Sequence, residues 1–285
     1  MLKKPEWLKI RYIEDPNRQA VEGILEKLKL NTVCREAGCP NSMECFSRGT
    51  ATFMILGVNC TRTCSFCGVN AGTPTAPDSY EPRNIALAIK ELNLRYAVIT
   101  SVTRDDLPDG GAGHFAEVIK QIQKTNPGVG IEVLIPDFGG NTYALKTITD
   151  CAPAVVAHNI ETVASLYAAV RPEAIYRRSL NIIRDIKRLN PAVRSKSGIM
   201  LGLGETRESI IELLDDLRCA GCEFLTIGQY LAPSKKHYPV REYVEPAVFE
   251  AYAQIARDKG FEFVASAPFV RSSYRAEEAL EEGCK

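Results

Sequence analysis

The sequence predicts an α/β fold, a partial (β/α)6 barrel of the TIM type. Strand-like apolar runs alternate with helical patterns along most of the chain, and such alternation produces parallel βαβ units. The chain has 285 residues, and its first fifty lie outside the alternation. A complete barrel has eight units and usually about 250 residues, so the roughly six units present here fit an incomplete barrel better. The competing interpretation is an open doubly wound sheet, although no G-x-G-x-x-G motif follows the first strand.

Hydrophobic periodicity locates the individual elements. Before the alternation begins, Ile24, Leu25 and Leu28 fall on one face of a helix expected over 21–30. Short apolar runs predict strands over 51–56, 96–102, 131–136, 155–160, 197–203 and 223–230, with a last one over 261–265. Amphipathic patterns predict helices over 84–94, 113–124, 144–149, 162–170, 176–189, 207–219 and 246–259.

The composition excludes several classes of protein. The 35 basic and 35 acidic side chains cancel, so no bulk charge attracts the chain to nucleic acid or to an anionic membrane. Hydrophobic residues make up 45% of the chain, which is enough for a core and argues against disorder. No apolar run reaches the roughly 18 residues of a membrane span, and no apolar segment follows the first lysines as in a signal peptide. We therefore expect a cytoplasmic protein without a membrane or nucleic-acid partner.

Ten cysteines in a chain from a reducing compartment indicate metal binding or catalysis rather than disulfides. Six of them lie in two groups of three between residues 34 and 67. The pair Cys219-Ala-Gly-Cys222 has the spacing of a redox motif. Because it stands between a helix and a strand, we interpret both cysteines as small core residues, and Cys151 and Cys284 likewise.

The second group consists of Cys60, Cys64 and Cys67, hereafter the loop cysteines, which follow the first predicted strand. Three thiolates can hold three irons of a cubane and leave the fourth iron open for a ligand with an amine and a carboxylate. A [4Fe–4S] cluster that binds S-adenosylmethionine has this arrangement. Phe66 is expected to shield such a cluster from water. The alternative is structural zinc, which requires four ligands where this loop offers three.

The first group consists of Cys34, Cys39 and Cys45, hereafter the N-terminal cysteines. Its spacings of four and five residues fit neither a zinc ribbon nor a two-cluster ferredoxin. By the same count it could hold a second cluster in which one iron needs a different ligand. A zinc site shared by all six cysteines is the alternative, although a predicted strand separates the two groups.

Polar and glycine-rich segments follow several predicted strands. They cover 103–111, 158–161 and 202–205. Chemistry in parallel α/β folds takes place at the carboxyl ends of strands, so these segments are candidates for the site. Ordinary turns between strands and helices have the same composition, and only the neighbouring cysteines favour the functional interpretation.

Further motifs accompany the two cysteine groups. They are Gly49-Thr-Ala-Thr-Phe-Met-Ile-Leu-Gly57 before Cys60-Thr-Arg, Thr100-Ser-Val followed by Arg104-Asp-Asp-Leu, and Arg271-Ser-Ser-Tyr-Arg-Ala near the end. The loop cysteines by themselves resemble the radical S-adenosylmethionine superfamily. The whole combination resembles, nearly end to end, the lipoyl synthase family within it. Val58, Asn59 and Thr103 depart from the residues common in that family.

The resemblance implies a sulfurtransferase that inserts sulfur at C6 and C8 of an octanoyl chain linked to a lysine of a carrier domain. No general base can remove hydrogen from such unactivated carbons, so a cofactor must supply a radical. The resemblance implies two [4Fe–4S] clusters and S-adenosylmethionine as cofactors. The cluster of the loop cysteines generates the 5′-deoxyadenosyl radical, and the cluster of the N-terminal cysteines is the sulfur donor.

The resemblance also implies further site residues. The N-terminal cluster takes Ser273 as its fourth ligand, with Ser272 as the alternative, and the C-terminal tail then folds over the barrel mouth. S-adenosylmethionine is expected to contact Thr100, Ser101, Asn159, Glu161, and either Arg171 or Arg178 through its carboxylate. The chain then divides into an N-terminal extension over 1–50, a barrel over 51–265 and a tail over 266–285.

The implied partners are an octanoylated lipoyl domain and a one-electron donor. The domain belongs to the E2 component of a 2-oxoacid dehydrogenase or is the glycine cleavage H protein, and the donor is a flavodoxin or a ferredoxin. Two other classes stay open at this point: an electron carrier with two clusters, and a zinc-stabilised binding module. The absence of a basic stripe argues against nucleic acid as the ligand of such a module.

Overall fold

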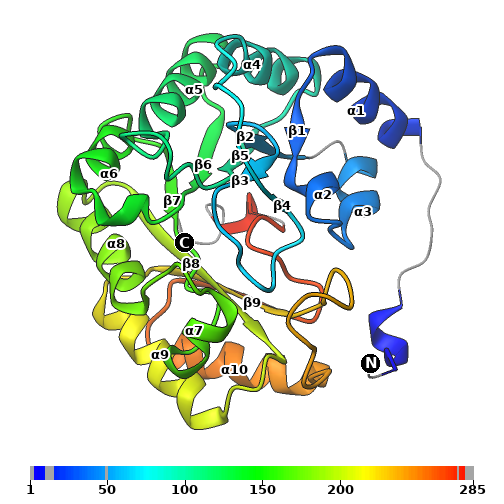
Figure 1. Ribbon diagram of the computed structural model, residues 1–285, viewed down its shortest axis with the longest axis vertical. Helices are drawn as coiled ribbons and strands as arrows, with labels where there is room; N and C mark the ends of the chain where they lie inside the picture. Colours follow the sequence, from blue (N-terminus) through cyan, green and yellow to red (C-terminus); the bar gives the residue numbers. More distant parts are fainter. Residues whose placement is uncertain (1–2, 10–15, 49–50, 275, 280–285) are drawn as a thin grey trace. The chain divides into compact units, whose positions relative to one another are not determined.

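The chain divides into two units, and each carries part of the alternation of strands and helices (Figure 1). The N-terminal unit comprises Arg11–Arg62 and Gly68–Val156, and the C-terminal unit comprises Met1–Ile10, Thr63–Cys67 and Ala157–Lys285. The structure is a computed structural model that describes residues 3–9, 16–48, 51–274 and 276–279.

The N-terminal unit contains a sheet in the order β1-β2-β5-β6. Its strands are β1 (Asn31–Thr32), β2 (Thr52–Ile55), β5 (Tyr96–Ser101) and β6 (Gly130–Leu134). The last three run parallel, and only the short β1 is antiparallel to its neighbour. All four residues of β2 are buried, as expected for a parallel strand covered on both faces.

Helices follow the strands of this unit. They are α4 (Glu81–Glu91), α5 (Ala112–Thr125) and α6 (Thr142–Thr149), with a 3-10 turn, η2 (Phe138–Gly140), before the last. Figure 1 shows α4 and α5 side by side. The Asn141 side chain caps α6 by accepting the N–H groups of Tyr143 and Ala144, so this helix begins where its sequence provides an N-cap.

The N-terminal cysteines lie before β2, two of them on short helices and Cys39 in the segment between those helices. The chain runs through α1 (Pro16–Lys27), β1, α2 (Val33–Glu36) and α3 (Ser42–Ser47). Thr32 starts α2 by accepting the N–H of Arg35 at 3.3 Å. The helix expected over 21–30 begins earlier and ends earlier than predicted, since Lys29 takes a left-handed backbone conformation (φ 54°).

The C-terminal unit contains three parallel strands in the order β8-β9-β10. They are β8 (Arg194–Leu201), β9 (Phe224–Gln229) and β10 (Phe263–Ser266). The helices between and beside them are α8 (Tyr176–Leu189), α9 (Arg207–Cys219) and α10 (Pro246–Asp258), and η1 (Glu6–Leu8) also belongs to this unit. Apolar side chains of α9 and α10 pack on the strands in one core that includes Leu213, Leu225 and Phe249.

Most predicted elements are confirmed with shifted ends, and two depart further from expectation. The strand predicted over 155–160 is β7 (Val155–Ala157), and within it the chain passes from one unit to the other. The helix predicted over 162–170 is a 3-10 turn, η3 (Ala164–Leu166), followed by one turn of α7 (Tyr167–Val170). The short strands β3 (Asn59–Cys60) and β4 (Asn70–Ala71), which pair with each other, were not predicted, because a strand of two residues shows no hydrophobic periodicity.

In the described part of the chain, no helix is both long and apolar enough to cross a membrane.

Candidate active site

The loop that carries the loop cysteines begins with a strained residue at the end of β2. Leu56 has a left-handed backbone conformation (φ 68°), which costs a non-glycine residue about 1–2 kcal/mol. Its N–H donates to the buried Glu81 carboxylate at 3.0 Å, and its carbonyl accepts from Arg104 Nη1 at 3.1 Å. Both backbone groups are thus satisfied, and the chain turns sharply out of the sheet at this point.

Cys60 is fixed by its neighbours within the N-terminal unit. It lies on β3, pairs with Ala71 of β4, and accepts the N–H of Gly72 at its carbonyl at 2.9 Å. Its sulfur accepts two backbone N–H groups, from Thr103 at 3.3 Å and from Arg62 at 3.5 Å. Such N–H···S bonds stabilise negative charge on sulfur, so the surroundings of Cys60 suit a metal-bound thiolate.

Arg62 is buried between two carboxylates, and we call Arg62, Asp105 and Asp137 the Arg62 clamp. Its Nε and Nη2 bond both oxygens of Asp105 at 2.7 and 2.8 Å, and Nη2 also bonds Asp137 at 2.6 Å. Burial by itself would lower the pKa of Arg62, but the hydrogen bonds to the two carboxylates outweigh it and raise that pKa. No motif in the sequence predicts this role of Arg62, although aspartates just after two neighbouring strands were a signal for it.

Cys64 and Cys67 belong to the C-terminal unit, where the loop is held by backbone bonds. The N–H of Cys67 donates to the Cys64 carbonyl at 3.1 Å. Ser65 donates its N–H to the Val170 carbonyl at 3.0 Å and accepts the N–H of Tyr238 at 2.8 Å. Phe66, between these residues, packs against an apolar cluster formed by Val170, Leu203 and Tyr230.

Asn159, Glu161 and Arg171 lie together after β7. Arg171 Nη1 donates to the Asn159 carbonyl at 2.9 Å and to the Tyr167 hydroxyl at 2.7 Å. Burial raises the pKa of Glu161, while the charge of Arg171 and a hydrogen bond from Asn159 oppose this shift. Among the described residues, the buried Oδ1 of Asn159 has no hydrogen-bond partner. Such an atom fits a ligand that brings a hydroxyl or N–H donor, so these residues fit the expected cofactor.

Thr100 and Ser101 end β5 in the N-terminal unit, and they differ in what their hydroxyls do. The Thr100 hydroxyl donates to the Leu134 carbonyl of the next strand at 3.1 Å. The buried Ser101 hydroxyl has no partner within the described part of the chain. Ser101 is therefore the better candidate for a polar contact with a ligand. Arg178, the alternative to Arg171, lies half-buried in the first turn of α8.

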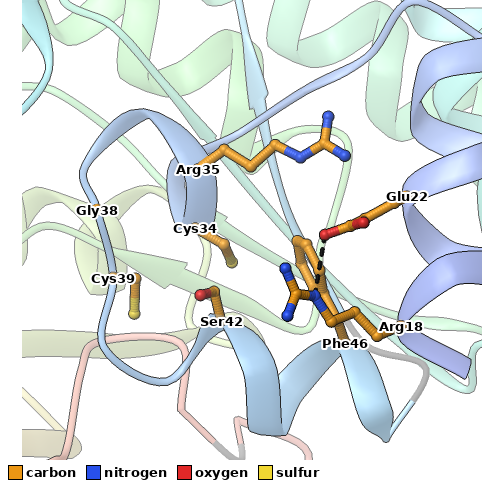
Figure 2. Close-up of a pocket in the computed structure, with 8 residues that line it drawn as sticks. All are labelled: Arg18, Glu22, Cys34, Arg35, Gly38, Cys39, Ser42 and Phe46. Atoms are coloured by element: carbon orange, nitrogen blue, oxygen red, sulfur yellow. Dashed lines mark hydrogen bonds and ion pairs between the residues drawn. The ribbon is translucent and has the colours of Figure 1, made fainter. Parts of the chain in front are cut away.

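Two of the N-terminal cysteines, Cys34 and Cys39, line a pocket of about 410 Å³. Figure 2 shows their thiols and the Ser42 hydroxyl on one side of this pocket and the ion pair of Arg18 with Glu22 on the other. Burial is the main cause that raises the pKa of Cys34 to about 11, and the nearby Cys39 adds to it. Cys45 lies on α3 and is not among the lining residues.

No group of three His, Cys, Asp or Glu side chains in the described residues is close enough to hold a metal ion. The described cysteines form no disulfides. The ligand sets of the two clusters therefore stay predictions that rest on residue type and spacing. Ser272 and Ser273 lie in a turn closed by the bond from the Tyr274 N–H to the Arg271 carbonyl at 3.0 Å.

The cysteines outside the two groups are only partly as predicted. Cys222 is fully buried, and its thiol donates to the Phe224 carbonyl at 3.2 Å, as expected for a core residue. Cys219 is exposed, so its interpretation as a core residue is wrong: it ends α9 on the face turned to solvent. Cys151 is half-buried. Cys284 lies outside the described residues, as do Gly49, Thr50 and Arg275 of the family motifs.

Comparison with known proteins identifies the family. A model of the Radical SAM (S-adenosylmethionine) superfamily matches residues 54–217. The chain is 54% identical over 279 residues to the lipoyl synthase of Alkaliphilus metalliredigens, a match that covers 98% of this chain and 96% of that relative. It is 55% identical over 276 residues to the lipoyl synthase of Caldicellulosiruptor bescii, covering 97% and 95% of the two chains.

A solved structure shows the same fold. The crystal structure of methylornithine synthase (PylB) aligns with a TM-score of 0.54 at 14% identity, over 92% of this chain and 86% of that chain. The predicted fold class, an α/β partial barrel of the TIM type, is therefore confirmed. The chain belongs to the Radical SAM superfamily and, within it, to the lipoyl synthase family.

Proposed function

We propose that this chain is a sulfurtransferase that inserts sulfur at C6 and C8 of a protein-bound octanoyl chain, the reaction of lipoyl synthase. The observation that carries the proposal is the extent of the match to lipoyl synthases, which covers 98% of the chain. The superfamily model begins only at residue 54, after the N-terminal cysteines. The similarity to lipoyl synthases thus includes the segment that distinguishes this chain from a general radical SAM domain.

Family membership implies [4Fe–4S] clusters and S-adenosylmethionine as the cofactors. The loop cysteines hold one cluster, and the N-terminal cysteines with Ser273 hold the other. When bound, these groups supply an organic radical that removes hydrogen from an unactivated carbon, and the sulfur that replaces it. The two N–H groups on the Cys60 sulfur and the buried position of Cys34 support these assignments.

The chain's own side chains bind and orient S-adenosylmethionine. Asn159 Oδ1 accepts a hydrogen bond from one of its polar groups, and the Ser101 hydroxyl accepts or donates another, because each atom is buried without a partner among the described residues. Thr100 contributes less, since its hydroxyl is already bonded. Glu161 accepts a hydrogen bond from a ribose hydroxyl, and Arg171 or Arg178 forms an ion pair with the carboxylate of the methionine part.

The partners follow from the reaction. We propose as substrate an octanoylated lipoyl domain, from the E2 component of a 2-oxoacid dehydrogenase or from the glycine cleavage H protein, and a flavodoxin or ferredoxin as electron donor. The extension over 1–50 carries the N-terminal cluster, the barrel covers 51–265, and the tail over 266–285 brings Ser273 to that cluster. Cluster ligands must remain reduced thiols, which favours the cytoplasm.

One experiment tests the function directly. Anaerobically reconstituted protein is incubated with an octanoylated carrier peptide, S-adenosylmethionine and dithionite. The mass of the peptide is then measured by mass spectrometry. We expect a product with two added sulfurs and a brown protein whose EPR signal changes with S-adenosylmethionine. A brown protein that leaves the peptide unchanged would indicate an electron carrier, and a colourless protein with bound zinc would indicate a binding module.

A labelling experiment tests the source of the sulfur. The clusters are reconstituted with heavy sulfide, and one turnover is run without added iron or sulfide. Both sulfurs of the product should carry the label, because the N-terminal cluster is the donor. Unlabelled product would instead point to a persulfide on a cysteine. The exposed Cys219 would then be the first cysteine to replace by mutation.

A further inference from the structure

We propose that Arg62, with Asp105 and Asp137, is a positioning residue that sets the reduction potential of the cluster held by the loop cysteines. It does so by fixing two backbone N–H groups on the Cys60 sulfur. This inference rests on the proposed function, in which Cys60 is a ligand of that cluster.

The Arg62 clamp joins three segments of the N-terminal unit. Arg62 comes from the cysteine loop, Asp105 from the segment after β5, and Asp137 from the segment after β6. Arg62 bonds Asp105 through a planar two-point contact, at 2.7 and 2.8 Å, and reaches the fully buried Asp137 at 2.6 Å. A guanidinium held at three points in a buried position cannot rotate without breaking charged hydrogen bonds.

The clamp is connected to both N–H groups that Cys60 accepts. One of them is the N–H of Arg62 itself, at 3.5 Å from the sulfur. The other belongs to Thr103, at 3.3 Å, whose carbonyl accepts the N–H and hydroxyl of Thr61 at 3.1 and 3.0 Å. The Thr61 hydroxyl in turn accepts the N–H of Asp105 at 3.1 Å. The same hydroxyl lies 3.2 Å from Oδ2 of Asp105, the oxygen that accepts from Arg62 Nε, so a displacement of the Asp105 carboxylate loosens the two donors together.

These N–H groups affect electron transfer because they interact with the negative charge that the cluster gains on reduction. A cluster that accepts an electron gains one negative charge, part of which lies on its thiolate ligands. Hydrogen bonds to those sulfurs stabilise the reduced form more than the oxidised form, so they raise the reduction potential. Loosening the clamp should weaken both bonds and make the cluster harder to reduce.

Arg62→Lys separates geometry from charge. Lysine retains the positive charge but offers a single compact ammonium, which cannot make the two-point contact with Asp105 and reach Asp137 as well. A fall in potential in this variant thus reports lost positioning, because the net charge of the clamp is unchanged. Asp137→Glu is a second variant that retains every charge and moves the carboxylate by one methylene.

Arg194 provides a matched control within the same chain. It also bridges two carboxylates, Glu223 at 2.7 Å and Glu262 at 2.9 Å. It stands at the first residue of β8, where parallel strands begin, whereas the cysteine loop follows the end of a strand. Arg194→Lys therefore makes the same exchange of side chain between two acids at a position outside the cysteine loop.

The experiment is an anaerobic redox titration of the reconstituted full-length protein, followed by the EPR signal that S-adenosylmethionine alters. Iron content and circular dichroism are recorded for each variant, and the titration is scaled to the clusters present. In Arg62→Lys we expect about a tenfold lower ratio of reduced to oxidised cluster at a fixed potential, which is 59 mV for a one-electron couple. Asp137→Glu should shift in the same direction by less, and Arg194→Lys should titrate as the wild type does.

The outcomes separate this inference from the proposed function. A wild-type protein without an EPR signal that responds to S-adenosylmethionine would refute the function. A wild type with that signal, together with Arg62→Lys and Asp137→Glu variants that titrate at its potential, would overturn the role of the clamp alone. If Arg62→Lys fails to fold or to take up iron, the shift in Asp137→Glu decides the question.

Discussion

The carboxylate of Glu81 accepts the backbone N–H of Leu56 at 3.0 Å and thereby holds a left-handed residue at the exit of β2. Both residues are buried, and the same carboxylate oxygen lies 2.7 Å from His114 Nε2. A side chain on the first turn of α4 thus determines where the strand stops and the cysteine loop starts.

This contact predicts a measurable loss of stability. Glu81→Ala leaves the Leu56 N–H buried without an acceptor, so we expect the free energy of unfolding to fall by about 1–3 kcal/mol in urea denaturation. The control is Glu91→Ala, which removes only a surface ion pair with Lys27 and should cost less than about 1 kcal/mol. Equal losses in the two variants would contradict the importance of the buried contact.

The two groups of cysteines should be functionally separable. Cys64→Ala removes a ligand of the cluster that cleaves S-adenosylmethionine, so no 5′-deoxyadenosine should form. Cys39→Ala affects the sulfur donor and should retain some cleavage while forming no lipoyl product. Liquid chromatography measures both products. Equal loss of cleavage in the two folded variants, with the other cluster intact, would disprove this division of labour.

Ser273 should be a labile ligand of the N-terminal cluster. A serine alkoxide is a harder ligand than a thiolate and matches iron in a sulfide cluster less well, so its bond should break first. Ser273→Cys should therefore retain the cluster, measured as bound iron, and stall transfer of sulfur to the octanoyl chain. Ser272→Cys is the matched neighbour and should behave as the wild type. A Ser273→Cys enzyme that makes product at the normal rate would show that lability is not required.

Cys222 should make stability fall at high pH. Burial raises its pKa from 9.0 to about 12 in the folded protein, so the folded state retains a proton that the unfolded state loses. The contribution is fully present below pH 9 and is lost as pH rises toward 12. In Cys222→Ala, the free energy of unfolding should decline less over this interval than in the wild type. Equal declines in the wild type and in Cys222→Ala would contradict this role of the buried thiol.

Local patterns predicted most of the fold. The strands that became β2, β5, β6, β8 and β9, and the helices between them, were placed from their apolar periodicity. Errors occurred where backbone conformation overrides propensity, as at Lys29 and Glu161, both left-handed without being glycine. At Glu161 this conformation is fixed by contacts from elsewhere in the chain: its N–H donates to the Gly198 carbonyl, and its carbonyl accepts the N–H of Met200.

The sequence by itself determined the fold class, the two cysteine groups and the family. Thiol identity and spacing are properties of a short stretch of chain, so the chemistry they allow can be read before any folding is considered. Only the tertiary structure decided what holds Cys60 in place. Arg62 meets Asp105 and Asp137, which lie 43 and 75 residues away. No periodicity connects residues so far apart, and parallel strands bring them together because their carboxyl ends meet at one edge of the sheet.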